Sequence, residues 1–269
     1  MKEQPNQEKI LHFVPKDARE ANGSGNTPEA VLEKARLCME NRDYKMANTY
    51  AKTCLERDPD NLAAQTVYAM TVINDKESEE QFDLFLKKAV TRMQRERWDV
   101  GDERFAAYLQ MRGEYGNLLT EEGKYHLACH QYEAILEADP LDRQKHRYRL
   151  ASLYAILEQR ERLETLLQKY PSQEESPFFQ FPLAVAAFKE SDYAVADRLM
   201  RSLCKRSKHW ADAFRQDMFV TLTDHMDDYD KQGYQPGTFD EMLAVLDCNA
   251  ILLVTTPGFT DYGISLTYL

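Results

Sequence analysis

Apolar side chains recur at the spacing of an α-helix in segment after segment, from about residue 28 to the end of the chain. Residues that favour helices, such as Leu, Ala, Glu, Lys and Met, are frequent throughout, whereas Gly and Pro number only 10 each. Runs of β-branched residues are brief, chiefly "ILLVTT" at 251–256, so there is little material for a sheet. The pattern predicts an all-α protein.

The first 27 residues do not follow this pattern. They hold one short apolar patch, "ILHFV" at 10–14, and end in the turn-forming stretch "ANGSGNT", which predicts a flexible leader. Thr27 and Pro28 then predict a helix start, with Thr27 as N-cap and Pro28 at the first helical position. We therefore expect a leader at 1–27, a helical repeat domain at 28–232, and a C-terminal helical cap at 233–269 after the turn-rich "GYQPG".

Three stretches of the chain align without gaps, at 40–61, 120–142 and 189–210. Each has a turn, then a tyrosine, then an alanine three residues later, and in the first two a proline follows twelve residues after the alanine. A proline cannot continue a helix, so it marks the end of each unit. The repeated positions are Tyr44, Tyr125 and Tyr193; Ala47, Ala128 and Ala196; and Pro59 and Pro140.

These residues resemble the tetratricopeptide repeat family, and the middle unit resembles it most. Gly116 and Ala128 stand where the family has small residues that let two antiparallel helices approach, and Tyr132 stands where an aromatic residue packs toward the next unit. Arg112 replaces the usual tryptophan, and the unit at 143–176 has lost its alanine in "RERLETLLQKY". The segment from 103 to 150 is also similar to a family of bacterial tetratricopeptide-like proteins of unassigned biochemical function. The resemblance implies a right-handed α-solenoid of about four to five helical hairpins with a C-terminal cap.

The remaining segments fit this organisation. Residues 62–103 predict an enlarged unit with a first helix in "LAAQTVYAMTVIN" and a long second helix. After residue 211, "DAFRQDMFVTLTDHMDDY" predicts one more helix, and the apolar helical pattern from 238 onward predicts the cap. Thr238, with Glu241 three residues later, predicts a capping box.

Charge and cysteine content narrow the class of protein. The chain has 34 Lys and Arg against 45 Asp and Glu, a net charge of −11, which disfavours binding to nucleic acid or to anionic membranes. Its five cysteines include no close pair, which argues against a disulfide framework or a zinc ribbon. With no signal peptide or membrane span in the pattern, we expect a cytoplasmic protein.

Two clusters suggest metal chemistry. His126, Cys129 and His130 share one helical face at i, i+3 and i+4, and the stretch from Asp224 to Asp230 is dense in carboxylates. In the repeat register both histidines face water and Cys129 packs inward, and the acidic stretch lacks the glycine of a calcium loop. We therefore predict no metal site, no cofactor and no catalytic constellation.

The prediction that remains is a non-catalytic scaffold that binds a peptide or a partner helix in the concave groove lined by the first helices. The alternative is a metal-binding protein or metal-assisted hydrolase that uses His126 and His130 or the Asp224–Asp230 cluster. A third hypothesis is a peptide-sensing regulator. The basic run Arg143–Arg149 is either a patch for an acidic partner or an internal ion-pair network, and the oligomeric state stays open. Candidate partner-binding residues are Tyr108, Arg112, Asn117, Arg147, Tyr148, Arg149 and Tyr154.

Overall fold

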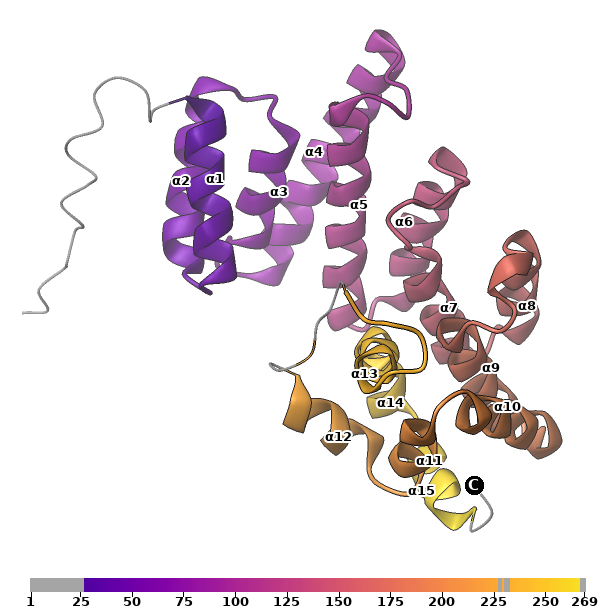
Figure 1. Ribbon diagram of the computed structural model, residues 1–269. Coiled ribbons are helices and arrows are strands. Elements are labelled where there is room, and N and C mark those ends of the chain that lie inside the picture. The colour runs from indigo at the N-terminus through magenta and orange to yellow at the C-terminus, as the bar shows by residue number, and fades with distance from the viewer. Residues whose placement is uncertain (1–26, 227–228, 230–232, 267–269) are drawn as a thin grey trace, which may run out of the picture. The chain divides into compact units, whose positions relative to one another are not determined.

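The computed structural model describes residues 27–226, 229 and 233–266, and the regular elements of these residues are helices (Figure 1). The all-α prediction is confirmed for this part of the chain. The fold divides into two compact units, Met1–Phe85 and Leu86–Leu269. None of the helices in the described ranges is long and apolar enough to cross a membrane.

The first unit is built around a helical hairpin. Thr27 caps α1 by accepting a hydrogen bond from the backbone N–H of Ala30 at 3.3 Å, and Pro28 is the first helical residue, as predicted. Small residues that are 0% exposed, among them Ala35, Ala47 and Ala51, bring α1 and α2 into close contact. The elements of this unit are α1 (Pro28–Glu40), α2 (Tyr44–Arg57), α3 (Leu62–Met70) and the first half of α4 (Asp75–Glu96).

The second unit continues the pattern of paired helices. Each pair is followed by a short connection and the next pair, and a 3-10 turn at Pro171–Gln173 leads into the last of them. The paired helices are α5 (Glu103–Glu121) with α6 (Tyr125–Ala138), α7 (Arg147–Ile156) with α8 (Arg160–Lys169), and α9 (Pro177–Lys189) with α10 (Tyr193–Arg206).

The four hairpins α1/α2, α5/α6, α7/α8 and α9/α10 share one register. Nine residues before the second helix starts, each hairpin has a buried small residue: Ala35, Gly116, Ala151 or Ala184. Three residues after that start, each has a side chain that is 0% exposed: Ala47, Ala128, Leu163 or Ala196. The predicted alanines Ala47, Ala128 and Ala196 are thus buried between helices, and the hairpins are tetratricopeptide-like. The predicted tyrosines Tyr44 and Tyr193 are about half exposed, and Pro59 and Pro140 are exposed where the chain leaves the second helix.

The turns of the hairpins repeat as well. Two residues before each second helix the backbone is left-handed, at Arg42 (φ 59°), Gly123 (φ 75°), Glu158 (φ 58°) and Ser191 (φ 63°). Only one of these four positions carries glycine, the residue that adopts this conformation without steric cost. The shared conformation shows that one turn geometry joins the two helices in every hairpin.

Gly116 is required because the ring of Tyr132 lies directly on it. A Cβ atom at Gly116 would come within 2.8 Å of the Tyr132 Cζ atom. Tyr132 is 1% exposed, its hydroxyl donates to Asn117 Oδ1 at 2.7 Å, and its ring lies 5.7 Å from the His146 ring of the next hairpin. The expected contact of Tyr132 with the following unit is confirmed.

The region after α10 differs from the single helix that was predicted there. The chain forms α11 (Lys208–Phe214) and α12 (Met218–His225) with a break between them. The cause is Asp217, whose carboxylate accepts the backbone N–H groups of Phe219 and Val220 at 2.9 and 3.2 Å and so starts a new helix. The last part of the predicted helix, at 227–228, lies outside the described residues.

The C-terminal segment forms three short helices, α13 (Phe239–Cys248), α14 (Ala250–Thr255) and α15 (Pro257–Ser265). Thr238 accepts the N–H of Glu241 at 3.3 Å, as the capping box predicts. The Glu241 carboxylate is used differently, because it accepts the Gly237 N–H at 2.7 Å and the guanidinium of Arg206 at 2.8 Å instead of the Thr238 N–H.

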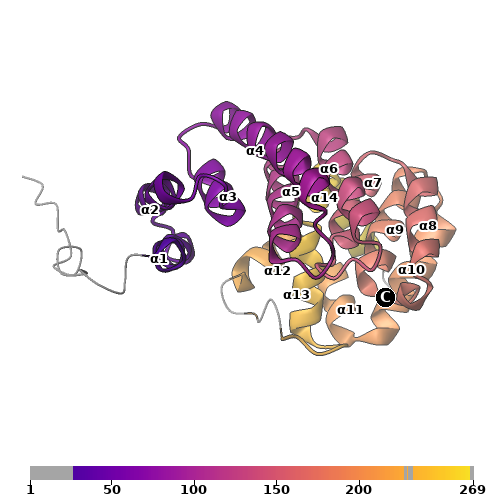
Figure 2. The ribbon, with the colours of Figure 1, turned by 90° about the horizontal axis from the view of Figure 1, so that it is seen from above.

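These C-terminal helices pack on the first helices of the last two hairpins. α13 contacts α7 and α9, and α14 contacts α7 (Figures 1 and 2). Phe181 of α9 lies 5.6 Å from Trp210 and 5.8 Å from Phe259, and Phe188 lies 5.5 Å from Phe259, measured between ring centroids. We call the side of α7 and α9 that contacts these helices the inner face. It is covered by the chain's own C-terminal segment.

Candidate binding groove

The predicted partner-binding residues of α5 take part in contacts within the fold. Tyr108 is 3% exposed, and its hydroxyl accepts a hydrogen bond from Arg112 Nε at 2.6 Å. Arg112 also donates to Gln131 Oε1 of α6 at 2.7 Å, and Asn117 accepts from Tyr132. The polar atoms of these side chains are thus engaged between α5 and α6.

The three arginines of the basic run from Arg143 to Arg149 have partners within the fold. Arg143 Nη1 lies 2.6 Å from Asp139 Oδ1, and Arg147 Nη1 lies 2.9 Å from Asp142 Oδ2. Arg149 Nη1 donates to the backbone carbonyl of Cys248 at 3.2 Å, at the C-terminal end of α13, where a helix favours positive charge. Of the two alternatives left open by the sequence, the contacts of Arg143 and Arg147 match the internal ion pairs, while Arg149 binds a backbone carbonyl.

Tyr148 and Arg149 also line a cavity of about 310 Å³ between α7 and α13. The ring of Tyr148 stacks on that of Phe178 with centroids 4.5 Å apart, and its hydroxyl donates to Gln173 Oε1 at 2.7 Å. This cavity lies on the inner face and is small, because the C-terminal helices fill most of the space beside α7.

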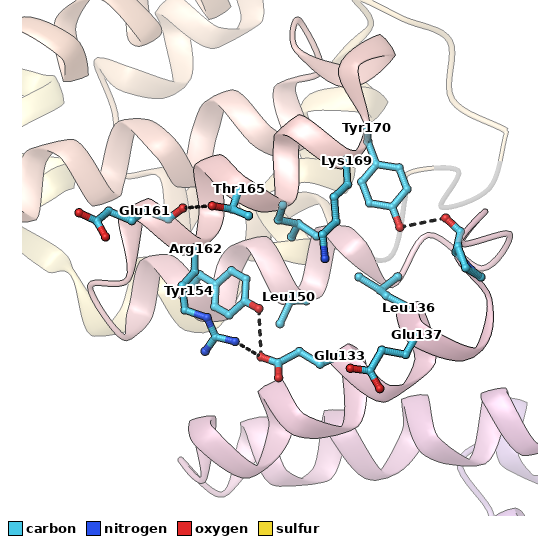
Figure 3. A pocket seen from close by; sticks show the side chains of 12 residues that line it. Glu133, Leu136, Glu137, Leu150, Tyr154, Glu161, Arg162, Thr165, Lys169 and Tyr170 are labelled. Atoms are coloured by element: carbon cyan, nitrogen blue, oxygen red, sulfur yellow. Dashed lines mark hydrogen bonds and ion pairs between the residues drawn. The ribbon is translucent and has the colours of Figure 1, made fainter.

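A larger hollow lies on another side of α7. It occupies about 780 Å³ between the second helices α6 and α8, with α7 as its floor (Figure 3). We call it the α6–α8 groove. Its apolar surface comes from leucines of all three helices, Leu136, Leu150 and Leu166, while the charged side chains stand on α6 and α8. Its further lining residues are Glu133, Glu137, Pro140, Tyr154, Glu161, Arg162, Thr165, Lys169 and Tyr170.

Tyr154 is the predicted partner-binding residue that lies in this groove. Its hydroxyl donates to Glu133 Oε1 at 3.0 Å, and Arg162 Nη2 donates to the same oxygen at 2.8 Å (Figure 3). The Arg162 guanidinium also lies 4.6 Å from the centroid of the Tyr154 ring. Burial and the hydrogen bond to the Glu133 carboxylate raise the pKa of Tyr154, so its hydroxyl remains a hydrogen-bond donor at neutral pH. This trio ties α6, α7 and α8 together.

The charged side chains at the ends of the groove are unpaired. Glu161 lies at one end, and Glu137 and Lys169 lie toward the other (Figure 3). All three are exposed, and none forms an ion pair or a side-chain hydrogen bond with the residues that the structure describes. The groove therefore offers charges that a ligand can bind without breaking a contact of the fold.

The side chains of the candidate metal cluster on α6 do not converge on one point. Cys129 is 3% exposed, while the side chains of His126 and His130 are exposed on the surface of α6. Burial raises the pKa of the Cys129 thiol to about 12, so it does not supply a thiolate at neutral pH. Within the described ranges no three His, Cys, Asp or Glu side chains are grouped so as to hold a metal. The acidic stretch at 224–230 lies partly outside those ranges.

The sequence did not indicate the α6–α8 groove and showed only that one of the two bordering hairpins departs from the repeat pattern. In the α7/α8 hairpin Leu163 takes the place of the alanine found three residues into the other second helices. The substitution at this position marked the hairpin as irregular. This difference in sequence does not indicate which surface beside the hairpin is open to a ligand.

Comparisons with known proteins give a fold likeness only. No protein-family model matches the chain, and no curated protein matches it. Among solved structures it is similar to the MamA protein (TM-score 0.48, 12% identity, 67% of this chain and 92% of that one). It is also similar to a tetratricopeptide repeat protein from Parabacteroides merdae, with a TM-score of 0.49 and 15% identity over 86% of this chain and 78% of that one. A third similar structure is YrrB, described as a TPR protein with an unusual peptide-binding site, with a TM-score of 0.46 and 12% identity over 75% of this chain and 93% of that one. Likenesses at these scores carry no conclusion about what this chain binds or does.

Proposed function

We propose that the protein is a non-catalytic interaction scaffold that binds a short peptide segment of a partner in the α6–α8 groove. Helical-repeat folds are a kind of architecture that serves protein interaction. The observation that carries the proposal is the groove itself, which combines about 780 Å³ of open space, an apolar floor and unpaired charged rims. This surface replaces the concave groove of the sequence prediction, because α13 and α14 cover the inner face of α7 and α9.

The other predicted partner-binding residues are weaker candidates for contact with a ligand. Their polar atoms already have partners in the fold, so a ligand that used Arg112 or Arg147 would have to break the bonds to Gln131 or Asp142. Leaving a buried polar group without its partner costs about 1 to 3 kcal/mol. Binding in the α6–α8 groove carries no such cost at Glu137, Glu161 or Lys169.

The test uses the full chain and a phage-displayed library of short random peptides. Peptides selected on the wild-type protein are measured by fluorescence anisotropy against Thr165→Trp, which places an indole in the groove. The matched control is Gln168→Trp, which puts the same side chain on an exposed position of α8 that does not line the groove. Circular dichroism verifies that both variants keep their helices.

We expect Thr165→Trp to weaken binding by about tenfold or more, equivalent to about 1.4 kcal/mol, and Gln168→Trp to leave it unchanged. Equal binding by the two variants would place the ligand elsewhere. Failure to select any peptide that binds the folded protein would overturn the proposed function.

A further inference from the structure

The ends of the α6–α8 groove carry more unpaired negative than positive charge. Glu137 and Glu161 are both exposed and without an ion pair among the described residues, whereas Lys169 is the matching unpaired cation of the lining. The other two charged residues of the lining, Glu133 and Arg162, form an ion pair with 2.8 Å between Glu133 Oε1 and Arg162 Nη2, so their charges cancel. The whole chain is also acidic, with a net charge of −11. Both the local and the long-range field therefore favour a basic ligand.

The length of the groove indicates how such a ligand lies in it. Glu161 and Lys169 are eight residues apart on α8, which corresponds to about 12 Å at the helical rise of about 1.5 Å per residue. Glu137 lies at the same end of the groove as Lys169, opposite Glu161 (Figure 3). An extended chain covers about 3.3 Å per residue, so side chains four positions apart reach both ends.

The apolar floor lies between these two ends. In an extended segment the side chains at i, i+2 and i+4 point to the same face. A segment with basic residues at i and i+4 and an apolar residue at i+2 therefore presents two cations toward Glu161 and Glu137. Between them it presents one apolar side chain toward Leu150 and its neighbours. The Lys169 ammonium remains available to donate to a backbone carbonyl of the segment.

On this basis we infer that the partner's segment is extended, with the pattern basic–x–apolar–x–basic. The inference rests on the proposed function, because it names the ligand of the same groove. Its affinity depends on carboxylates at the rim, so it weakens as salt rises.

The experiment uses three peptides with neutral ends and glycine-serine flanks: Arg-Ser-Leu-Ser-Arg, Glu-Ser-Leu-Ser-Glu and Arg-Ser-Ser-Ser-Arg. Each is titrated against the full chain by isothermal calorimetry. The first is expected to bind about tenfold or more tightly than either of the others, which lack the basic or the apolar part. Thr165→Trp is expected to abolish this binding.

Reversing the charges at the two ends of the α6–α8 groove tests the electrostatic contribution to peptide binding. The double variant Glu137→Lys and Glu161→Lys should lose affinity for the basic peptide and gain it for the acidic one. The control is Glu40→Lys and Glu56→Lys, two exposed positions of the first unit, which changes the net charge by the same amount, from −11 to −7 (four charges in each case). It should leave the preference unaltered.

The two proposals fail in different ways. Peptide binding that Thr165→Trp removes, but that is indifferent to charge or favours the acidic peptide, would overturn the basic pattern and leave the scaffold function standing. If none of the three peptides binds and the library yields no ligand either, both proposals fall.

Discussion

The hairpins α5/α6 and α7/α8 share one register and one turn geometry and both border the α6–α8 groove, yet their second helices are packed differently. In α5/α6 the small residues Gly116 and Ala128 are buried, and the ring of Tyr132, at 1% exposure, lies directly against Gly116. In α7/α8 the position of Ala128 is taken by Leu163, and the position of Tyr132 by Leu167, which is only half-buried. The same backbone plan thus holds different side chains at the same two positions of the second helix, and the aromatic ring of one hairpin is more deeply buried than the leucine of the other.

The strongest way to sharpen this comparison is to truncate the same position in both hairpins. Tyr132→Ala removes a buried ring and its hydrogen bond to Asn117, which we expect to lower the free energy of unfolding by about 3 to 5 kcal/mol. Leu167→Ala removes a half-buried side chain and should cost about 1 to 2 kcal/mol. Urea denaturation followed by circular dichroism measures both. Similar losses would mean that the two positions are packed alike.

A smaller effect is expected from adding a single methyl group to the α5/α6 hairpin. In Gly116→Ala the new Cβ meets the Tyr132 ring at 2.8 Å, so either the ring or α6 has to move. Overpacking of this kind costs about 1 to 3 kcal/mol. The double variant Gly116→Ala with Tyr132→Leu should cost less than the sum of the two single changes, because the shorter side chain frees the space. Strict additivity would rule out the contact as the cause.

The smallest expected change in stability comes from the protonation of His146, which lies in the connection between α6 and α7. Burial lowers the pKa of His146 from its usual value of 6.5, an effect to which Arg149 adds and which Asp142 and Asp139 oppose. The unfolded chain therefore takes up a proton at this site at higher pH than the folded protein does. The contribution of His146 to stability is complete above pH 6.5 and declines as the pH falls below that value.

Urea denaturation at about pH 7.5 and pH 5.5 measures this dependence. His146→Gln should lose less stability on acidification than the wild-type protein, by an amount smaller than the two effects above. Equal losses in both proteins would show that the His146 ring is not desolvated. NMR titration of the His146 ring measures its pKa directly, and we expect that pKa to lie below 6.5.

Much of the fold could be predicted because the features that encode it are local. Ala47, Ala128 and Ala196 recur at a fixed distance from a turn, and Thr27 and Thr238 start helices through contacts three residues away. Such signals lie within one turn of helix, so a single sequence displays them.

The binding surface could not be predicted in the same way because it depends on distant contacts. Arg149 bonds to the carbonyl of Cys248, 99 residues away, and no local pattern indicates that pairing. One sign was available: the run "PFFQFPLAVAAF" at 177–188 is apolar on all sides, which is typical of a helix that is covered all round. It predicts that something packs on the inner face of α9, without saying that α13 and its neighbours do so.

The covered inner face also bears on how the protein is made. Phe181 leaves the ribosome 78 residues before its partner Phe259, and synthesis at about 5 to 20 residues per second leaves that ring without its cover for about 4 to 16 seconds. The last two hairpins therefore complete their core only after α15 has been synthesised. A nascent chain that stalls in this interval exposes a row of aromatic rings, which chaperones bind and which promote aggregation.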